Sequence, residues 1–260
     1  MPLSFYKKPA LVVYVTCGDP DLATTRDVVL AAIEAGADVI ELGVPFSDPV
    51  ADGPVIQRAS ERALKNGTSL AQVLTLAAEV RQHAQSTGLV VFSYLNPILR
   101  MGMEKFGMVA RHAGVDGVLV TDLPVEEAGE YLRAMKANDL APVFLAAPTS
   151  PDARLKRIAE ASLGFVYAVS RTGVTGTRQQ VADDAQKLVR RLRRVTTLPV
   201  AVGFGISNAG QFAAVGEFAD AVVVGSAIVE TIERNQGREA AAVGDFVRKL
   251  SSCQLSAVSS

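Results

Sequence analysis

The chain has 260 residues, of which 49% are hydrophobic and 20% charged, and its formal net charge is −1. This composition excludes an intrinsically disordered chain and provides no basic field for binding nucleic acid. No apolar stretch approaches the roughly 20 residues of a membrane helix, and the first residues lack the apolar core of a signal peptide, so we expect a cytoplasmic protein. Cys17 and Cys253 are too few and too far apart for a metal knuckle or a disulfide framework, which agrees with a reducing compartment.

Short runs rich in β-branched residues recur along the chain, and an amphipathic stretch follows each. Eight runs predict strands at 10–16, 37–42, 89–94, 117–120, 141–145, 164–169, 199–202 and 219–224. Helical patterns occupy 23–35, 55–65, 70–86, 104–113, 126–136, 153–161, 183–193, 209–215 and 227–234. Eight consecutive strand–helix units without a linker favour one (β/α)8 TIM-barrel catalytic domain over 1–260, rather than a doubly wound open sheet. The Ser-rich end, 251–260, is expected to be disordered.

Residues that end the strands are the candidates for chemistry, because active sites of TIM barrels lie at the carboxyl ends of the strands. Glu41 falls at the end of the second predicted strand. Side chains alternate along a strand, so if Ile40 and Leu42 pack against helices, Glu41 points into the barrel mouth. Apolar surroundings there raise a carboxyl pKa towards the range useful for proton transfer. The alternative is a rim ion pair between Glu41 and an arginine.

The loop after this strand holds two further carboxylates between prolines. Asp52 is a second catalytic candidate, since two carboxylates can divide labour, one titrating while the other stays ionised. Because Asp52 stands just before Pro54, it could instead be a helix N-cap. Asp48 is better explained by turn chemistry. The prolines reduce the conformational freedom of the loop, as expected if its carboxylates are held at fixed positions.

Glycines gather after the last three strands, at 172–176, 203–207 and 225–226. Loops after strands seven and eight of a TIM barrel, with a helix N-terminus, commonly bind phosphate through backbone N–H groups. Three such clusters favour a phosphate site over turns alone. Both histidines, His83 and His112, and the lysines fall in helices or near the chain ends, so we expect no metal site and no Schiff-base lysine at a strand end.

The run ELGVPFSDPVADGPVIQRA, residues 41–59, resembles the signature of the tryptophan synthase alpha subunit family. Further stretches resemble the family in the same order over nearly the whole chain. They are 14–20, 94–98 with Gly102, 121–127, 147–151, Ser170 with 173–176, 203–207 and 225–229. The resemblance implies a lyase that cleaves indole-3-glycerol phosphate into indole and glyceraldehyde 3-phosphate by a retro-aldol reaction.

The resemblance also implies roles for individual residues. Glu41 would be the acid–base catalyst, and Asp52 would hydrogen-bond the indole N–H. Tyr94 and Tyr167 match positions near the substrate, although core packing explains them nearly as well, and Thr175 matches a loop threonine that orients Asp52. Three side chains could line an indole slot: Phe92, Leu119 and Phe204. Four residues match phosphate binders: Gly176, Gly205, Gly225 and Ser226.

The family resemblance implies a partner as well. Alpha subunits of this family pair with a beta subunit in an α2β2 heterotetramer, and pyridoxal phosphate is expected only in that beta partner. The segments 48–53 and 96–102 match docking surfaces, through which assembly would tune Glu41 allosterically. Only a few residues precede Ala10, whereas the family begins with a longer helix below the barrel, so a less well sealed floor is expected here.

Three alternatives remain open. A stand-alone indole-releasing lyase would use the same residues, and only the effect of a beta subunit would separate it from the alpha-subunit reading. A catalytically silent barrel that regulates another enzyme is disfavoured by the presence of Glu41 and Asp52. A phosphoribosyl-type isomerase would have similar glycine loops but does not need the ELGVPFSDP loop.

Overall fold

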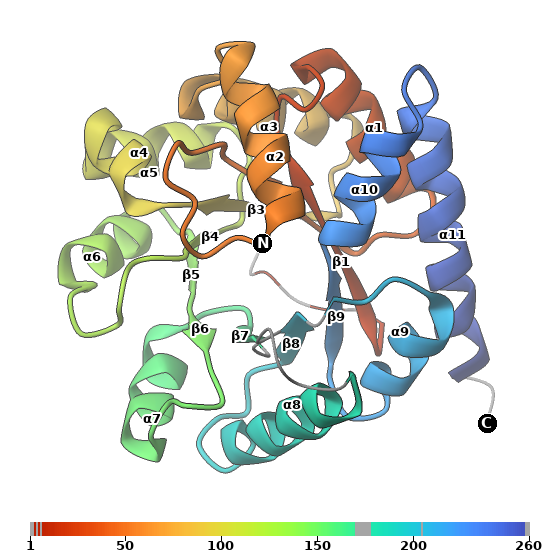
Figure 1. Cartoon of the computed structure of the whole chain (residues 1–260). Coiled ribbons are helices and arrows are strands. Elements are labelled where there is room, and N and C mark those ends of the chain that lie inside the picture. Colours follow the sequence, from red (N-terminus) through yellow and green to blue (C-terminus); the bar gives the residue numbers. More distant parts are fainter. Residues whose placement is uncertain (1–2, 4, 6, 170–177, 204, 258–260) are drawn as a thin grey trace.

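The computed structural model describes residues 3, 5, 7–169, 178–203 and 205–257. Nine parallel strands form one sheet in the order β5-β4-β3-β2-β1-β9-β8-β7-β6. Their bounds are β1 (Ala10–Thr16), β2 (Val39–Gly43), β3 (Gly88–Ser93), β4 (Gly117–Val120), β5 (Ala141–Val143), β6 (Leu145–Ala146), β7 (Val166–Val169), β8 (Val200–Gly203) and β9 (Ala221–Val224). Helices surround this sheet as an outer ring (Figure 1), so the predicted TIM-barrel class is confirmed.

The helices alternate with the strands along the chain. Their bounds are α1 (Leu22–Glu34), α2 (Pro54–Lys65), α3 (Leu70–His83), α4 (Leu95–Met101), α5 (Met103–His112), α6 (Gly129–Ala137), α7 (Asp152–Ala161), α8 (Arg178–Leu192), α9 (Ala209–Gly216), α10 (Ser226–Arg234) and α11 (Glu239–Ala257). The sequence patterns missed α4, whose Pro97 falls in the first turn, where a missing N–H is tolerated. Across the described residues, none of these helices combines the length and the apolar character needed to cross a membrane.

The fifth predicted strand is divided in the structure. Phe144 separates β5 from β6, and the two pieces pair with different neighbours, β5 with β4 and β6 with β7. The carbonyls of Pro142 and Phe144 accept from the N–H groups of Leu163 and Tyr167, at 2.8 and 3.1 Å. One run of chain therefore joins the two edges of the sheet, which is how the barrel closes.

Alternation along the strands sorts their side chains into two layers. Ile40 and Leu42 pack in the cluster between the sheet and the helices, whereas Val39 belongs to the cluster inside the barrel with Val90 and Leu119. Glu41 is fully buried on the same face of β2 as Val39. The predicted inward orientation of Glu41 is thus confirmed.

Leu3 packs at the barrel floor, near the amino ends of β3, β4 and β7. Its side chain is 5% exposed, and a Cβ atom built on Gly88 would come within 2.7 Å of Leu3 Cδ1. Phe5 packs on Phe165 with ring centroids 5.2 Å apart. Leu3 and Phe5 therefore place two apolar side chains in the floor, and a cavity beside Leu3 is described below.

The Ser-rich end of the chain is ordered further than expected. Helix α11 continues to Ala257, so the predicted disorder of 251–260 is wrong for 251–257, while 258–260 lie outside the described residues. Gln254 is buried and its Nε2 donates to Pro9 O at 2.6 Å and to Asp38 Oδ2 at 3.1 Å. Ser251 Oγ donates to Ala35 O at 2.8 Å. These long-range contacts hold a segment whose composition alone indicates fraying.

Candidate active site

Glu41 is a buried carboxyl group that forms no ion pair with any described residue. Its side chain is 0% exposed, and among the residues that the structure describes neither carboxylate oxygen has a hydrogen-bond partner. Burial raises the pKa of Glu41 to about 8, because removal from water disfavours the charged form. The rim ion pair considered above is therefore absent from the described part of the chain. At neutral pH the group carries a proton that it can donate.

Asp52 lies in the loop between β2 and α2 and is half-buried. The hydroxyl of Tyr94 donates to Asp52 Oδ2 at 2.9 Å. Burial raises the pKa of Asp52 to about 6, and the hydrogen bond from Tyr94 opposes that rise. Gly53, and not Asp52, is the N-cap residue of α2, so the capping alternative for Asp52 is wrong.

The aromatic ring of Tyr94 and the amide of Gln57 hold this loop in place. Tyr94 also accepts from the N–H of Ala51 at 2.9 Å, and its ring stacks on Phe46 with centroids 4.9 Å apart. Gln57, in the first turn of α2, donates from Nε2 to Asp52 O at 2.9 Å and to Pro49 O at 3.3 Å. Sequence reasoning missed Gln57, although its position one turn inside a helix that follows the loop is the signal that could have found it.

The contacts of Asp48 agree with the turn role predicted for it. It is exposed, its carboxylate accepts from Ser47 Oγ at 2.7 Å, and its carbonyl accepts from the N–H of Val50 at 2.8 Å. These contacts stay within the loop. Asp48 therefore shapes the turn that presents Asp52.

A cavity of about 150 Å³ opens at the barrel mouth beside Glu41. It is lined by Tyr14, Glu41, Ile56, Phe92, Tyr167, Gly203, Gly205, Val223, Gly225 and Ser226. One end of this cavity therefore holds a carboxyl group, and the other end is formed by glycines and the start of a helix. Apolar and aromatic side chains form the walls between them. Leu119 is instead fully buried in the barrel interior, next to Phe92 in the strand register. Thr175, Gly176 and Phe204 lie outside the described residues.

Tyr14 and Tyr167 line this cavity together with Glu41, whereas Asp52 is not among its lining residues. Burial raises the pKa of Tyr14 and of Tyr167 well above the usual value, and the charges of Glu41 and Asp52 add to that rise. Both tyrosines therefore remain neutral and lie within electrostatic reach of both carboxylates. Sequence reasoning did not single out Tyr14 as a site residue, although it stands directly opposite Glu41 in the register of β1 and β2.

The glycine end of the cavity has the features of an anion site. Gly225 is the N-cap of α10, and Ser226 is its first residue. Gly205 has φ +54°, a left-handed conformation that favours glycine, and it lines the same cavity. The first N–H groups of a helix lack intrahelical acceptors, so the start of α10 can bind a phosphate without a lysine.

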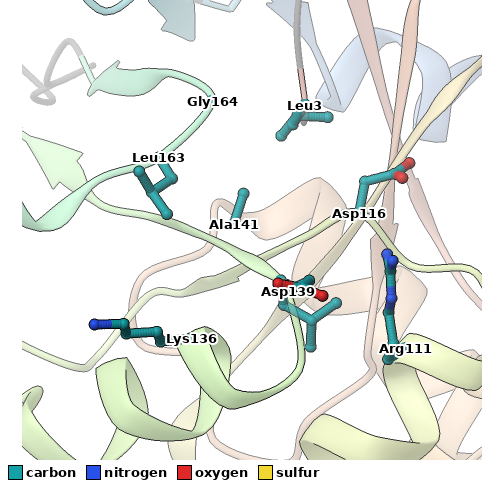
Figure 2. A pocket seen from close by; sticks show the side chains of 9 residues that line it. Leu3, Arg111, Asp116, Lys136, Asp139, Ala141, Leu163 and Gly164 are labelled. Atoms are coloured by element: carbon teal, nitrogen blue, oxygen red, sulfur yellow. The ribbon is translucent and has the colours of Figure 1, made fainter. Parts of the chain in front are cut away.

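A larger cavity, of about 480 Å³, lies at the opposite end of the barrel. Figure 2 shows Leu3, Leu163 and Ala141 around it, with Arg111 and Lys136 at its sides. Asp116, also in its lining, is used structurally, since it pairs with Arg81 at 2.6 Å and accepts from Leu89 N at 2.9 Å. Size does not select this cavity as the site, because catalytic groups of TIM barrels lie at the carboxyl ends of the strands.

The described residues contain no group of three His, Cys, Asp or Glu side chains placed to share a metal ion. Cys17 is buried and unreactive in character, because burial raises the pKa of its thiol far above the usual value. The polar groups available at the barrel mouth are therefore carboxyl groups, hydroxyls and backbone amides.

Comparison with known protein families gives a match over almost the whole chain. The model of the family described as "Tryptophan synthase alpha chain" matches residues 3–256. The tryptophan synthase alpha chain of Neisseria meningitidis serogroup B is 49% identical over 241 residues, which cover 93% of this chain and 92% of the relative. That of Solibacter usitatus is 52% identical over 228 residues, covering 88% and 85%.

Solved structures give the same result. A chain of the tryptophan synthase α2β2 complex of Pyrococcus furiosus superposes with a TM-score of 0.87 at 40% identity, covering 95% of this chain and 100% of that one. A chain of Mycobacterium tuberculosis tryptophan synthase also gives a TM-score of 0.87, at 37% identity, covering 95% and 92%.

Proposed function

The chain belongs to the tryptophan synthase alpha chain family, and from this premise we propose that its barrel mouth cleaves indole-3-glycerol phosphate into indole and glyceraldehyde 3-phosphate. One observation supports this site above all others. Glu41 is a fully buried carboxyl group, its oxygens have no partner among the described residues, and it faces a cavity whose far end is the start of α10. A proton donor and an anion site at opposite ends of one cavity suit a substrate with a ring at one end and a phosphate at the other.

Glu41 both gives and takes a proton in the proposed reaction. Its carboxyl group, with a pKa raised to about 8, protonates C3 of the indole ring, which places a positive charge on the ring nitrogen. The bond from C3 to the glycerol chain then breaks, and its electron pair returns to the ring to release indole. The glycerol hydroxyl on the departing carbon loses its proton to the Glu41 carboxylate and becomes the aldehyde. The catalyst ends in its starting state.

Asp52 supplies the negative charge that this reaction needs at the ring nitrogen. Its pKa of about 6 leaves it ionised at neutral pH, when Glu41 is still protonated. An anion that accepts from the indole N–H stabilises the charge that develops as C3 is protonated. The two carboxyl groups thus take different roles because their surroundings place their pKa values apart.

The rest of the substrate is assigned to the remaining groups. We assign the phosphate to Gly205, Gly225 and Ser226, together with Gly176, and the indole ring to walls that include Phe92, Tyr167, Leu119 and Phe204. Tyr94 positions Asp52, and Thr175 is proposed to do so from the loop after β7. The proposals for Thr175, Gly176 and Phe204 rest on the sequence match alone.

The proposal includes a cytoplasmic alpha subunit of an α2β2 complex. Val50 is 84% exposed and Leu99 is 52% exposed, and they lie in the two segments expected to dock on a beta subunit. Exposed apolar side chains on these segments suit a surface that a partner covers. Pyridoxal phosphate is assigned to the beta partner, while the residues of this chain carry out the cleavage.

Indole release by the purified chain, with and without a beta subunit, tests the proposal. We expect Glu41→Gln to lose about 10²–10⁴-fold in rate while still binding an unreactive analogue in which a saturated chain joins indole to phosphate. Asp52→Asn should lose rate with similar retention of binding. Near-normal turnover of Glu41→Gln would remove Glu41 from its role.

The same assay separates the alternatives. Full activity without a beta subunit, and no response to it, would indicate a stand-alone lyase. Absence of indole release by the unmodified chain in both conditions, with intact binding to a beta subunit, would indicate a silent regulatory barrel.

A further inference from the structure

We propose that an ion-pair cluster of Asp19, Arg58, Arg62 and Glu233 positions α2 against α10, and so fixes the spacing between Asp52 and the phosphate site. This inference rests on the proposed function, because it concerns how the two ends of that site are held at the separation that the substrate requires. None of the four residues lines the cavity at the barrel mouth.

The cluster joins three segments that are distant in sequence. Arg62, in the last turn of α2, donates from Nε and Nη2 to the two oxygens of Asp19, at 2.7 and 2.8 Å. Its Nη1 donates to Glu233 Oε1 in the last turn of α10 at 2.8 Å. One guanidinium group therefore links the loop after β1, α2 and α10.

Arg58 adds a second link one turn earlier in α2. Its Nη2 donates to Glu233 Oε2 at 3.1 Å, and its Nη1 donates to Pro54 O, in the first turn of α2, at 3.3 Å. Both oxygens of Glu233 are thus engaged by α2. A bidentate arrangement of this kind restricts orientation as well as distance.

The two tied helices begin at the two ends of the candidate site. Helix α2 begins at Pro54, two residues after Asp52, and α10 begins at Ser226 beside the proposed phosphate. The helices lie next to one another (Figure 1), and Ala59 and Val229 share a small buried cluster with Tyr14. The Arg62–Glu233 pair lies at the far ends of both helices, about 12 Å along α2 from its start, and Arg58 lies one turn nearer to that start.

Because of this placement, a change at the ion pairs moves the opposite end of α2. With the helices in contact at Ala59 and Val229, any tilt of α2 that opens the Glu233 end displaces its first turn and, through Gln57, the loop that carries Asp52. A misplacement of about 1 Å caused by a change far from the reacting atoms can cost about 10²-fold in rate. The ion pairs of Glu233 with Arg58 and Arg62 are partly exposed on both sides and contribute little to stability, so positioning accounts better for them.

Glu233→Gln is the informative variant, because it keeps the shape of the side chain and does not leave the buried Asp19 without its arginine. Three ligands distinguish a changed spacing between Asp52 and the phosphate site from general damage to the site. They are inorganic phosphate alone, indole alone, and the unreactive analogue that joins the two. We expect Glu233→Gln to bind the joined analogue about tenfold more weakly, to bind each fragment as the unmodified chain does, and to lower kcat/KM. Its melting temperature should fall by no more than about 3 °C.

Arg58→Gln provides a second variant that removes only the outer link, and it should give a smaller loss in the same direction. Glu160→Gln is the control, since Glu160 lies on α7 and pairs with Lys156 at 3.9 Å, and it should leave all three affinities unchanged. Equal weakening of the phosphate fragment and the joined analogue, or no change in either, would overturn the inference. Failure of the proposed function is distinguishable, because then the unmodified chain itself would release no indole.

Discussion

The hydroxyl of Tyr94, at the start of α4, donates to Asp52 Oδ2 across 2.9 Å and accepts from Ala51 N at the same distance. The residue that follows strand β3 therefore holds the carboxylate of a loop that follows strand β2. This contact couples the charge state of Asp52 to a residue 42 positions away.

The first prediction concerns pH. With Asp52 ionising near pH 6 and Glu41 losing its proton near pH 8, kcat/KM should rise through the first value and fall through the second. In Tyr94→Phe the carboxylate of Asp52 loses a donor that favours its charged form, so its pKa rises and the acidic limb of the profile moves up by about one pH unit. Rates of indole release between pH 5 and 9 measure this shift.

Tyr131→Phe is the control for this experiment. Tyr131 is also buried, but its hydroxyl donates to Val118 O, outside the site, at 2.7 Å. That variant should lose stability without moving the acidic limb. An unchanged limb in Tyr94→Phe would contradict the assigned role of the hydrogen bond.

The second prediction links Glu41 to stability. The folded chain keeps Glu41 protonated up to about pH 8, whereas an unfolded glutamate ionises near pH 4.5, so the stability present below pH 4.5 is lost as pH rises to about 8. Each pH unit over which only the unfolded chain is ionised costs about 1.4 kcal/mol. Glu41→Gln should therefore be more stable than the unmodified chain by several kcal/mol at pH 8, with a much smaller difference at pH 4.5.

Urea unfolding at both pH values tests this expectation. Glu34→Gln, an exposed change at the end of α1, should show no comparable pH dependence. A difference between Glu41→Gln and the unmodified chain that is constant from pH 4.5 to pH 8 would show that the carboxyl group is not held neutral.

The third prediction concerns the barrel floor. Leu3→Ala removes a 5% exposed side chain that packs against Gly88 and Gly164, and it should reduce the free energy of unfolding by about 2–4 kcal/mol. Because the floor is remote from Glu41, kcat at a temperature well below unfolding should stay near normal. Leu163→Ala, at a 55% exposed side chain beside the same cavity, is the control and should change stability little. A small loss in Leu3→Ala would mean that Leu3 does not seal the floor.

The fourth prediction addresses the phosphate site. A methyl group on Gly225 would meet Tyr14 atoms at 3.5 Å and beyond, which is ordinary contact, so Gly225→Ala should fold. The added methyl group lies in the cavity at the start of α10, and we expect it to raise KM about tenfold with a smaller effect on kcat. Gly244→Ala, within α11, should leave KM unchanged, and an unchanged KM in Gly225→Ala would argue for phosphate binding elsewhere.

Much of the barrel and the position of Glu41 could be predicted from the sequence, because both depend on short-range patterns. The alternation of Ile40, Glu41 and Leu42 determines which side chain faces inward once the strand is recognised. The glycines near 205 and 225 mark strand ends for the same local reason.

Contacts between distant segments could not be predicted in this way. Glu233 meets Arg58 and Arg62 across 175 and 171 residues, and the order of 251–257 depends on Gln254 reaching Pro9. The break at Phe144 reflects closure of the whole sheet, which no local pattern of residues 141–146 reveals. The local composition of these segments does not indicate which distant segment they contact.

The packed floor of the barrel affects where a substrate can enter and a product can leave. Leu3 lies beneath the strands, and side chains such as Val12, Val39 and Val90 are fully buried above it, so the described residues pack the barrel interior below Glu41. In the proposed reaction, incoming substrate and outgoing indole therefore both pass through the barrel mouth. A protein that covers the barrel mouth would then determine whether the small apolar product is released into water or passes to that protein.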